Sequence, residues 1–423
     1  MSISYTEKID KSIFICFVIW LIALGGALND FSSHSLNMNS LTQCILPLIL
    51  VYYAIRMHFK PVHLKEFCLV LGVLLIWQIL LIIKFGSYNV LVGRFYDALF
   101  AFIVIRTLGL KRFFFYFETA VAKLSIISII LWVVIVLMPS IKTLLLPFSL
   151  PINITGTQIA HWGIVGISNS ENLGLIRNLG FAWEPGRFSS IVVIALMMHL
   201  FRTHFVLFTT NFWPLLLGVL TSLATTGYMA MCVCVIGYFF NAQKSIYSQF
   251  LKILLPICFI LLTLSSPFLL DKIKAVSDSD TFLTDDVARY YTSIDKGYVP
   301  QRIEGLLLDF QNIINSPLIG YGDSSDYSYV RRILFPGLKI SLSDGVLQIV
   351  AMMGIPLSML FYWALYRSSK LFSTFYDIKG GYLFFLAICA VNVSYNFFFE
   401  PLFICMVLYC LFMPEKDKKY LTV

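Results

Sequence analysis

Long apolar stretches recur through this chain and limit its possible folds more than any other feature. A helix that crosses a membrane needs about 20 mostly apolar residues, and stretches of about this length follow one another from Ile13 to Met413. The chain has 13% charged residues, whereas a soluble domain has roughly 25%. A β-barrel is excluded because its segments are short and alternate in polarity. The pattern indicates a polytopic helical membrane protein.

The predicted spans share continuous apolar residues. They are Ile13–Leu28, Leu41–Met57, Phe67–Ile83, Val90–Leu108, Phe113–Met138, Gly186–Phe205, Leu251–Leu270, Gly345–Tyr366, Gly381–Asn396 and the shorter Pro401–Met413. The stretch Asn211 to Phe240 is too long for one helix, and Thr225-Thr226-Gly227 predicts a break within it. With two spans there, the total is about twelve. We therefore expect an all-α fold.

Basic residues predict the orientation of these spans, because lysine and arginine concentrate in cytoplasmic connections. They gather in alternate connections and in the tail: Arg56, Lys60, Lys65, Arg106, Lys111, Arg112, Arg202, Lys244, Lys252, Arg367, Lys370, Lys379, Lys416, Lys418 and Lys419. Both termini are therefore expected on the cytoplasmic side. The net charge of +8 follows from this arrangement, so it does not indicate a nucleic-acid partner.

Two long polar loops interrupt the apolar chain, and the same orientation puts both outside. We expect five segments: spans one to five (1–138), the first outer loop (139–184), spans six to nine (185–270), the second outer loop (271–342), and spans ten to twelve with the tail (343–423). Apolar residues at helical spacing over 301–314 predict an amphipathic helix on the membrane face. A bundle that only had to sit in a bilayer would not need such loops, so we expect them to form two sides of one site.

The first loop ends in charged residues next to a predicted helix start. Glu184 precedes Pro185, and proline suits the first position of a helix. The positive N-terminus of that helix, together with Arg177 and Arg187, would attract an anion. The alternative is that Glu184 caps the helix while the arginines extend among lipid headgroups.

The second loop contains further candidates. Arg302 starts the amphipathic helix, and the glycines on either side of Tyr321 predict a tight turn that a ligand can approach closely. Asp344 precedes the next span, where an aspartate serves either as a helix N-cap or as a catalytic group.

Charges also occur within or beside predicted spans. Arg94 and Asp97 lie three residues apart on one helix, where they either mark a functional site or pair with each other. Glu400 precedes Pro401 and so repeats the Glu184-Pro185 arrangement. All nine cysteines fall in apolar stretches and the histidines lack metal-ligand spacing, so neither a disulfide framework nor a metal site is expected.

Three motifs, in this order, resemble the O-antigen polymerase and ligase family (the Wzy group). They are GFAWEPGRF leading into a span, SLATTGYMAM at a broken span, and RIEGLLLDFQNIINSPLIGYG followed by SDGVLQIVAMMGIP. The resemblance implies a GT-C-like enzyme of a bacterial inner membrane that acts at the periplasmic face on undecaprenyl-diphosphate-linked oligosaccharide. It implies no metal and no cofactor. Ligases of this family usually carry a histidine where Asp344 stands, so a polymerase is favoured.

The resemblance also implies roles for the candidate residues. Arg177, Arg187 and Arg302 would bind the substrate diphosphate, Glu184 or Asp344 would be the general base, Tyr321 would pack on a sugar, and Arg94, Asp97 and Glu400 would support the site within the membrane. Apolar grooves between spans would hold the polyprenyl tails. Membrane lipids and a chain-length regulator are the expected partners.

Two alternatives remain open. One is an O-antigen ligase. The other is a transporter or flippase of lipid-linked oligosaccharide, which predicts inverted repeats and charges deep in several spans. The charges of this chain concentrate toward one face instead.

Overall fold

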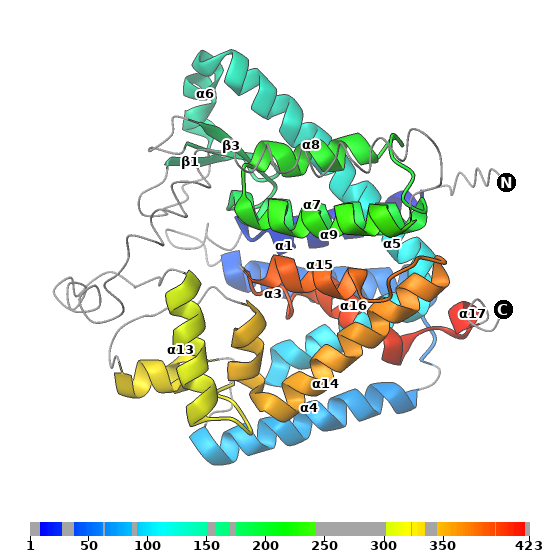
Figure 1. Cartoon of the computed structure of the whole chain (residues 1–423), viewed down its shortest axis with the longest axis vertical. Helices are drawn as coiled ribbons and strands as arrows, with labels where there is room; N and C mark the ends of the chain where they lie inside the picture. The colour runs from blue at the N-terminus through cyan, green and yellow to red at the C-terminus, as the bar shows by residue number, and fades with distance from the viewer. Residues whose placement is uncertain are drawn as a thin grey trace. The chain divides into compact units, whose positions relative to one another are not determined.

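The computed structural model describes residues 9–27, 38–61, 64–86, 91–149, 158–169, 175–241, 302–322, 324–334, 345–393 and 395–418. The chain forms two compact units, each described here by itself. The first unit comprises Met1–Pro61, Ile103–Tyr228 and Pro414–Lys419. The second comprises Val62–Phe102, Met229–Met413 and Tyr420–Val423. Figure 1 labels the elements of both.

The structure is mostly helical, and its helices are consistent with a multi-pass membrane protein. Among the described residues, three helices are long and apolar enough to cross a membrane: α4 (Leu64–Phe85), most of α5 (Leu91–Leu137) and α14 (Gly345–Phe375). Shorter apolar helices accompany them: α1 (Lys11–Gly25), the Ile45–Arg56 part of α3 (Met38–Arg56), α8 (Phe212–Ser222), α9 (Thr225–Asn241), α15 (Leu383–Asn392) and α16 (Pro401–Phe412).

The predicted spans are confirmed as helices wherever the structure describes them. The span predicted over Gly186–Phe205 is α7 (Pro185–Arg202), and the amphipathic helix predicted over 301–314 is α13 (Arg302–Asn315). The break predicted within 211–240 is confirmed by the end of α8 and the start of α9. The span predicted over Leu251–Leu270 lies outside the described residues.

Helix α5 contains a break at Gly109, where two separate spans were predicted. Gly109 has a φ of 70°, which no helix residue adopts. In the first unit, the short helix α17 (Glu415–Lys418) supplies partners for the interrupted backbone. Lys416 Nζ donates to the carbonyl oxygens of Thr107 (3.2 Å) and Leu108 (2.9 Å), and the Leu110 N–H donates to Asp417 Oδ2 (2.8 Å). A cation therefore meets the C-terminal end of one helix segment and a carboxylate meets the N-terminal end of the next.

The first outer loop holds a small sheet that an all-helical fold does not include. After α6 (Pro139–Leu145) and a 3₁₀ turn, η2 (Leu146–Phe148), come β1 (Gln158–His161), β2 (Gly166–Asn169) and β3 (Ile176–Gly180). The strands pair antiparallel in the order β1-β2-β3. They are too short to give an alternating pattern that the sequence alone would reveal.

Aromatic side chains fix this sheet to the end of α5. Trp132 Nε1 donates to the Ile176 carbonyl oxygen (2.9 Å), and Ile135 packs with Ala160 and Ile167 in one apolar cluster. His161 is fully buried beneath Gly166, and its Nδ1 accepts from the Gly163 N–H (3.0 Å). Burial lowers the pKa of His161 to about 4, so the imidazole is neutral at pH 7.

In the second unit, α14 is interrupted at Gly354, and the turn of residues 317–322 fills the interruption. Gly354 has a φ of 75°, and Pro356 lacks an N–H, so the helix leaves backbone groups unused. The Ile355 N–H donates to Pro317 (2.7 Å), while the Tyr321 and Gly322 N–H groups donate to Ala351 (3.1 Å) and Met352 (3.0 Å). The structure thus joins, backbone to backbone, the two parts of the third motif.

Candidate functional site

Glu184 lies at the start of α7, as predicted, but it does not cap that helix. Its backbone is extended (φ −139°, ψ 142°) and Pro185 takes the first helical position, yet its carboxylate makes no capping hydrogen bond. The side chain is half-buried. The capping alternative for Glu184 is therefore wrong. The carboxylate lies at the N-terminal end of α7 without a capping bond to it.

Arg187 is fixed one turn further along α7. Its Nε donates to the Leu24 carbonyl oxygen (2.8 Å) at the C-terminal end of α1. The same end of α1 meets the segment before α7, because Gly26 and Ala182 form a β-bridge and the Trp183 N–H donates to Gly25 (3.2 Å). Backbone at the end of α1 therefore orients the half-buried guanidinium.

Arg177, on β3, is held in the same way at the break between α8 and α9. Its Nε donates to the Ser222 carbonyl oxygen (3.3 Å) and its Nη2 to that of Leu223 (3.1 Å). The neighbouring Asn178 is buried and donates to Ser128 and Thr221 hydroxyls. Arg177, three residues before the first motif, thus contacts the start of the second motif within the first unit.

The structure describes the candidates of the second loop only in part. Arg302 begins α13, as predicted, but its side chain lies outside the described part of the chain, and so does Asp344. The convergence of the three arginines stays a prediction. Tyr321 is only 3% exposed and packs with Ala351 and Met352. Its turn approaches the α14 backbone, and the predicted contact with a sugar stays a prediction.

Arg94 and Asp97 form the predicted pair within the second unit. Arg94 Nη1 lies 3.1 Å from Asp97 Oδ2, and both side chains are largely buried. The guanidinium also stacks on Phe399, with its Cζ 3.6 Å from the ring centroid. Glu400 follows at the N-cap of α16, again without a capping bond from its side chain. The ion pair with Asp97 and the stacking on Phe399 fix the orientation of the Arg94 guanidinium.

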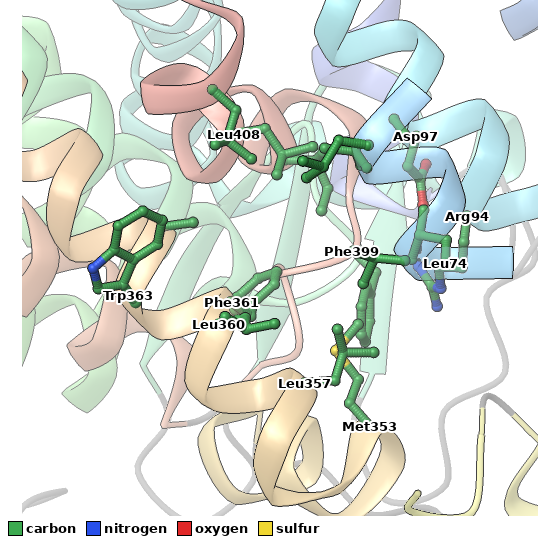
Figure 2. Close-up of a pocket in the computed structure, with 17 residues that line it drawn as sticks. Leu74, Arg94, Asp97, Met353, Leu357, Leu360, Phe361, Trp363, Phe399 and Leu408 are labelled. Atoms are coloured by element: carbon green, nitrogen blue, oxygen red, sulfur yellow. Dashed lines mark hydrogen bonds and ion pairs between the residues drawn. The ribbon is translucent and has the colours of Figure 1, made fainter. Parts of the chain in front are cut away.

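An apolar cavity of about 190 Å³ opens beside this pair (Figure 2). Its walls come from α4, the first turns of α5, α14, α16 and Phe399, two residues before α16. They are Leu69, Val70, Val73, Leu74, Ala98, Met353, Leu357, Leu360, Phe361, Trp363, Ala364, Phe399, Ile404, Leu408 and Leu411, with Arg94 and Asp97 as the only charged members of the lining. We call it the α4–α14 groove. The groove therefore combines apolar walls with one ion pair, Arg94–Asp97.

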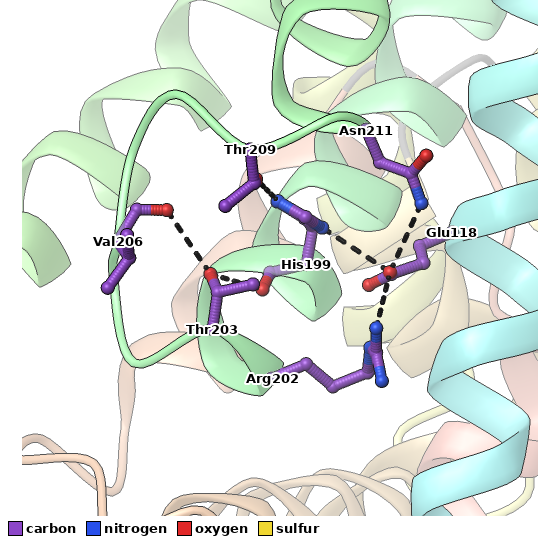
Figure 3. A network of polar contacts seen from close by, with 7 residues as sticks. All are labelled: Glu118, His199, Arg202, Thr203, Val206, Thr209 and Asn211. Carbon is purple, nitrogen blue, oxygen red and sulfur yellow. Dashed lines mark hydrogen bonds and ion pairs between the residues drawn. The ribbon is translucent and has the colours of Figure 1, made fainter. Parts of the chain in front are cut away.

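A buried polar cluster in the first unit was not foreseen (Figure 3). Oε1 of the fully buried Glu118, on α5, accepts from Arg202 Nη2 (3.0 Å), His199 Nδ1 (3.3 Å) and Asn211 Nδ2 (3.4 Å), and His199 Nε2 bonds with Thr209. The partners flank the turn between α7 and α8, which run side by side. A glutamate inside a predicted span was the available signal. The cluster holds this turn.

Comparisons with known proteins give no support beyond the geometry. No family model, no curated protein and no solved structure matches this chain.

Proposed function

We propose that this protein is an O-antigen (surface polysaccharide) polymerase of a bacterial inner membrane. It transfers a growing glycan from undecaprenyl diphosphate to the next lipid-linked repeat unit at the periplasmic face. The α4–α14 groove is the observation that carries this proposal. Polyprenyl diphosphate is a long apolar chain that ends in an anion, and the groove offers apolar walls for the chain beside the Arg94–Asp97 pair.

The proposed reaction is a glycosyl transfer between two such lipids. A hydroxyl oxygen of the acceptor sugar attacks the anomeric carbon of the donor, and the bond from that carbon to the diphosphate oxygen breaks. The hydroxyl proton passes to a carboxylate, for which Glu184 and Asp344 are the candidates. The negative charge that develops on the leaving diphosphate needs fixed cations. Arginine suits this task because it stays protonated and binds two oxygens at once.

Backbone support strengthens the assignment of two of these arginines. Arg177 and Arg187 each donate hydrogen bonds from the guanidinium to carbonyl groups at the end of a helix. A side chain fixed in this way does not lose further freedom when an anion binds, which favours binding. Arg302 stays with them as a proposed ligand of the diphosphate.

Filling the groove tests the proposal. Leu74→Trp places a large ring in the groove, and we expect it to lower polymer formation by about tenfold or more, since losing two buried CH₂ groups of a lipid costs about 1.6 kcal/mol. Polymer length is measured with purified full-length protein in nanodiscs that contain lipid-linked repeat units. Ile76→Trp, on the exposed side of the same helix, is the matched control and is expected to keep normal activity.

The same assay separates this function from its rivals. A transporter makes no polymer in nanodiscs from any variant, including the unaltered chain. In cells, loss of a polymerase leaves single repeat units attached to the lipid A core, whereas loss of a ligase leaves bare core and polymer on its carrier lipid. Unchanged polymer from Leu74→Trp would remove the groove from the mechanism.

A further inference from the structure

Two cationic side chains share one aromatic ring at the end of α4. Lys84 Nζ lies 4.9 Å from the centroid of Phe85, and Arg332 Cζ lies 5.9 Å from the same centroid. Phe85 in turn stacks on Tyr327, with centroids 5.0 Å apart and planes at 27°. All belong to the second unit. Distances of this size place both charges within reach of the ring's negative face.

The backbone around these cations is well supported. Arg332 belongs to a short π-helix, η4 (Val330–Leu334), whose first N–H donates to Asn312 Oδ1 (3.0 Å) on α13. Lys84 Nζ donates to the Ser316 hydroxyl just beyond α13. The two cations therefore come from different elements, and α13 links both.

Lys84 and Arg332 differ from the neighbouring Arg331 in their ionic partners. Arg331 forms an ion pair with Asp326, with Nη1 2.6 Å from Oδ1. Neither Lys84 nor Arg332 pairs with a carboxylate among the residues that the structure describes. Both side chains are exposed. Two like charges around one ring repel each other, and an anion between them would remove that repulsion and gain two charge-assisted hydrogen bonds.

The pair is connected to the α4–α14 groove through one aromatic cluster. Phe85, Tyr327 and Phe399 all pack on the buried residues Tyr321 and Met352, and Phe399 is the ring on which Arg94 stacks. The groove-lining Leu74 also shares α4 with Lys84, about 15 Å along the axis at 1.5 Å per residue. The Lys84–Arg332 pair and Arg94 thus each contact a ring that packs against the same buried cluster.

We propose that Lys84 and Arg332 bind a phosphate-bearing lipid headgroup. In naming the lipid, this inference rests on the proposed function: a polymerase holds two lipid diphosphates at once, and Arg177, Arg187 and Arg302 are proposed as ligands of one. The Lys84–Arg332 pair takes the second. An anionic phospholipid such as phosphatidylglycerol presents the same chemistry, so the test includes both.

Lipid binding to purified full-length protein in detergent, followed by native mass spectrometry, tests the proposal without relying on catalysis. Farnesyl diphosphate and phosphatidylglycerol are titrated separately. We expect the double variant Lys84→Gln/Arg332→Gln to lose one bound headgroup, with affinity at that site falling about tenfold for each cation removed. Preference for farnesyl diphosphate in the unaltered chain assigns the site to substrate, and equal affinity assigns it to bulk lipid.

Two matched controls separate binding from folding. Arg331→Gln removes a cation that is already paired, and Ser316→Ala removes the hydrogen bond of Lys84 while keeping its charge; both are expected to bind normally. If the double variant does not fold, Lys84→Met alone replaces it. Normal headgroup binding in the folded variant would overturn the inference. If the double variant loses headgroup binding but the unaltered chain makes no polymer, the inference is supported and the proposed function is refuted.

Discussion

Three cations of the first unit end in the same kind of place, on carbonyl groups at the C-terminal end of a helix segment. Arg187 meets α1, Arg177 meets α8, and Lys416 meets the segment of α5 before Gly109. A helix end carries partial negative charge, so each contact satisfies unused acceptors and offsets that charge. Arg177 and Arg187, which the sequence predicts to bind an anion, therefore also bind helix ends within the fold.

Glu118 is expected to be the residue of the first unit whose charge matters most for stability. Glu118→Gln removes the charge that Arg202 needs in a buried setting, and should lower the free energy of unfolding by about 3 kcal/mol. Thermal unfolding in detergent measures this. Arg56→Gln, which breaks the exposed pair with Asp10 (3.2 Å), should cost less than about 1 kcal/mol. Equal losses from both variants would show that the Glu118 cluster contributes no more than a surface pair.

His161 predicts a dependence of stability on pH. Its pKa is about 4 in the folded chain and about 6.5 when unfolded. As pH falls from about 6.5 to 4, the unfolded state binds a proton that the folded state does not, so stability decreases across this window and is unaffected above it. Melting temperature against pH measures the slope. His161→Gln should flatten it, and the exposed His58→Asn should not; a slope that survives His161→Gln would refute the assignment.

At the scale of whole elements, the described helices are interrupted rather than continuous. Breaks occur at Gly109 in α5, at Gly354 in α14 and between α8 and α9. Within a bilayer, backbone groups released by such breaks must find partners inside the protein. Lys416, the 317–322 turn and Arg177 are those partners. Each break therefore marks a place where a distant segment docks.

The turn at the α14 break depends on Gly320. Its φ is +74°, and a Cβ at this position would lie 2.1 Å from the Met352 carbonyl oxygen. Gly320→Ala should therefore lower the free energy of unfolding by about 1–3 kcal/mol from backbone strain alone. Gly305→Ala, on α13 with open space around it, should be neutral or stabilising by about 0.5–1 kcal/mol. Denaturant or thermal unfolding compares the two, and a neutral Gly320→Ala would contradict the docking.

At the scale of the whole molecule, apolar periodicity predicts the helices well because lipid-facing and buried positions both demand apolar residues. Starts such as Glu184-Pro185 and breaks such as the one before Thr225 follow from proline, glycine and threonine chemistry. The sheet of the first loop escaped prediction because its strands are four or five residues long. The α4–α14 groove escaped because its lining comes from segments almost 350 residues apart.

The hydrogen bonds between α17 and the break in α5 determine when the first unit can complete its fold during synthesis. The Leu110 N–H donates to the carboxylate of Asp417, which lies 307 positions later in the chain. A ribosome makes Leu110 long before Asp417, so the first unit is complete only after α17 has been made. Until Lys416 and Asp417 are made, the backbone groups on either side of Gly109 lack these partners.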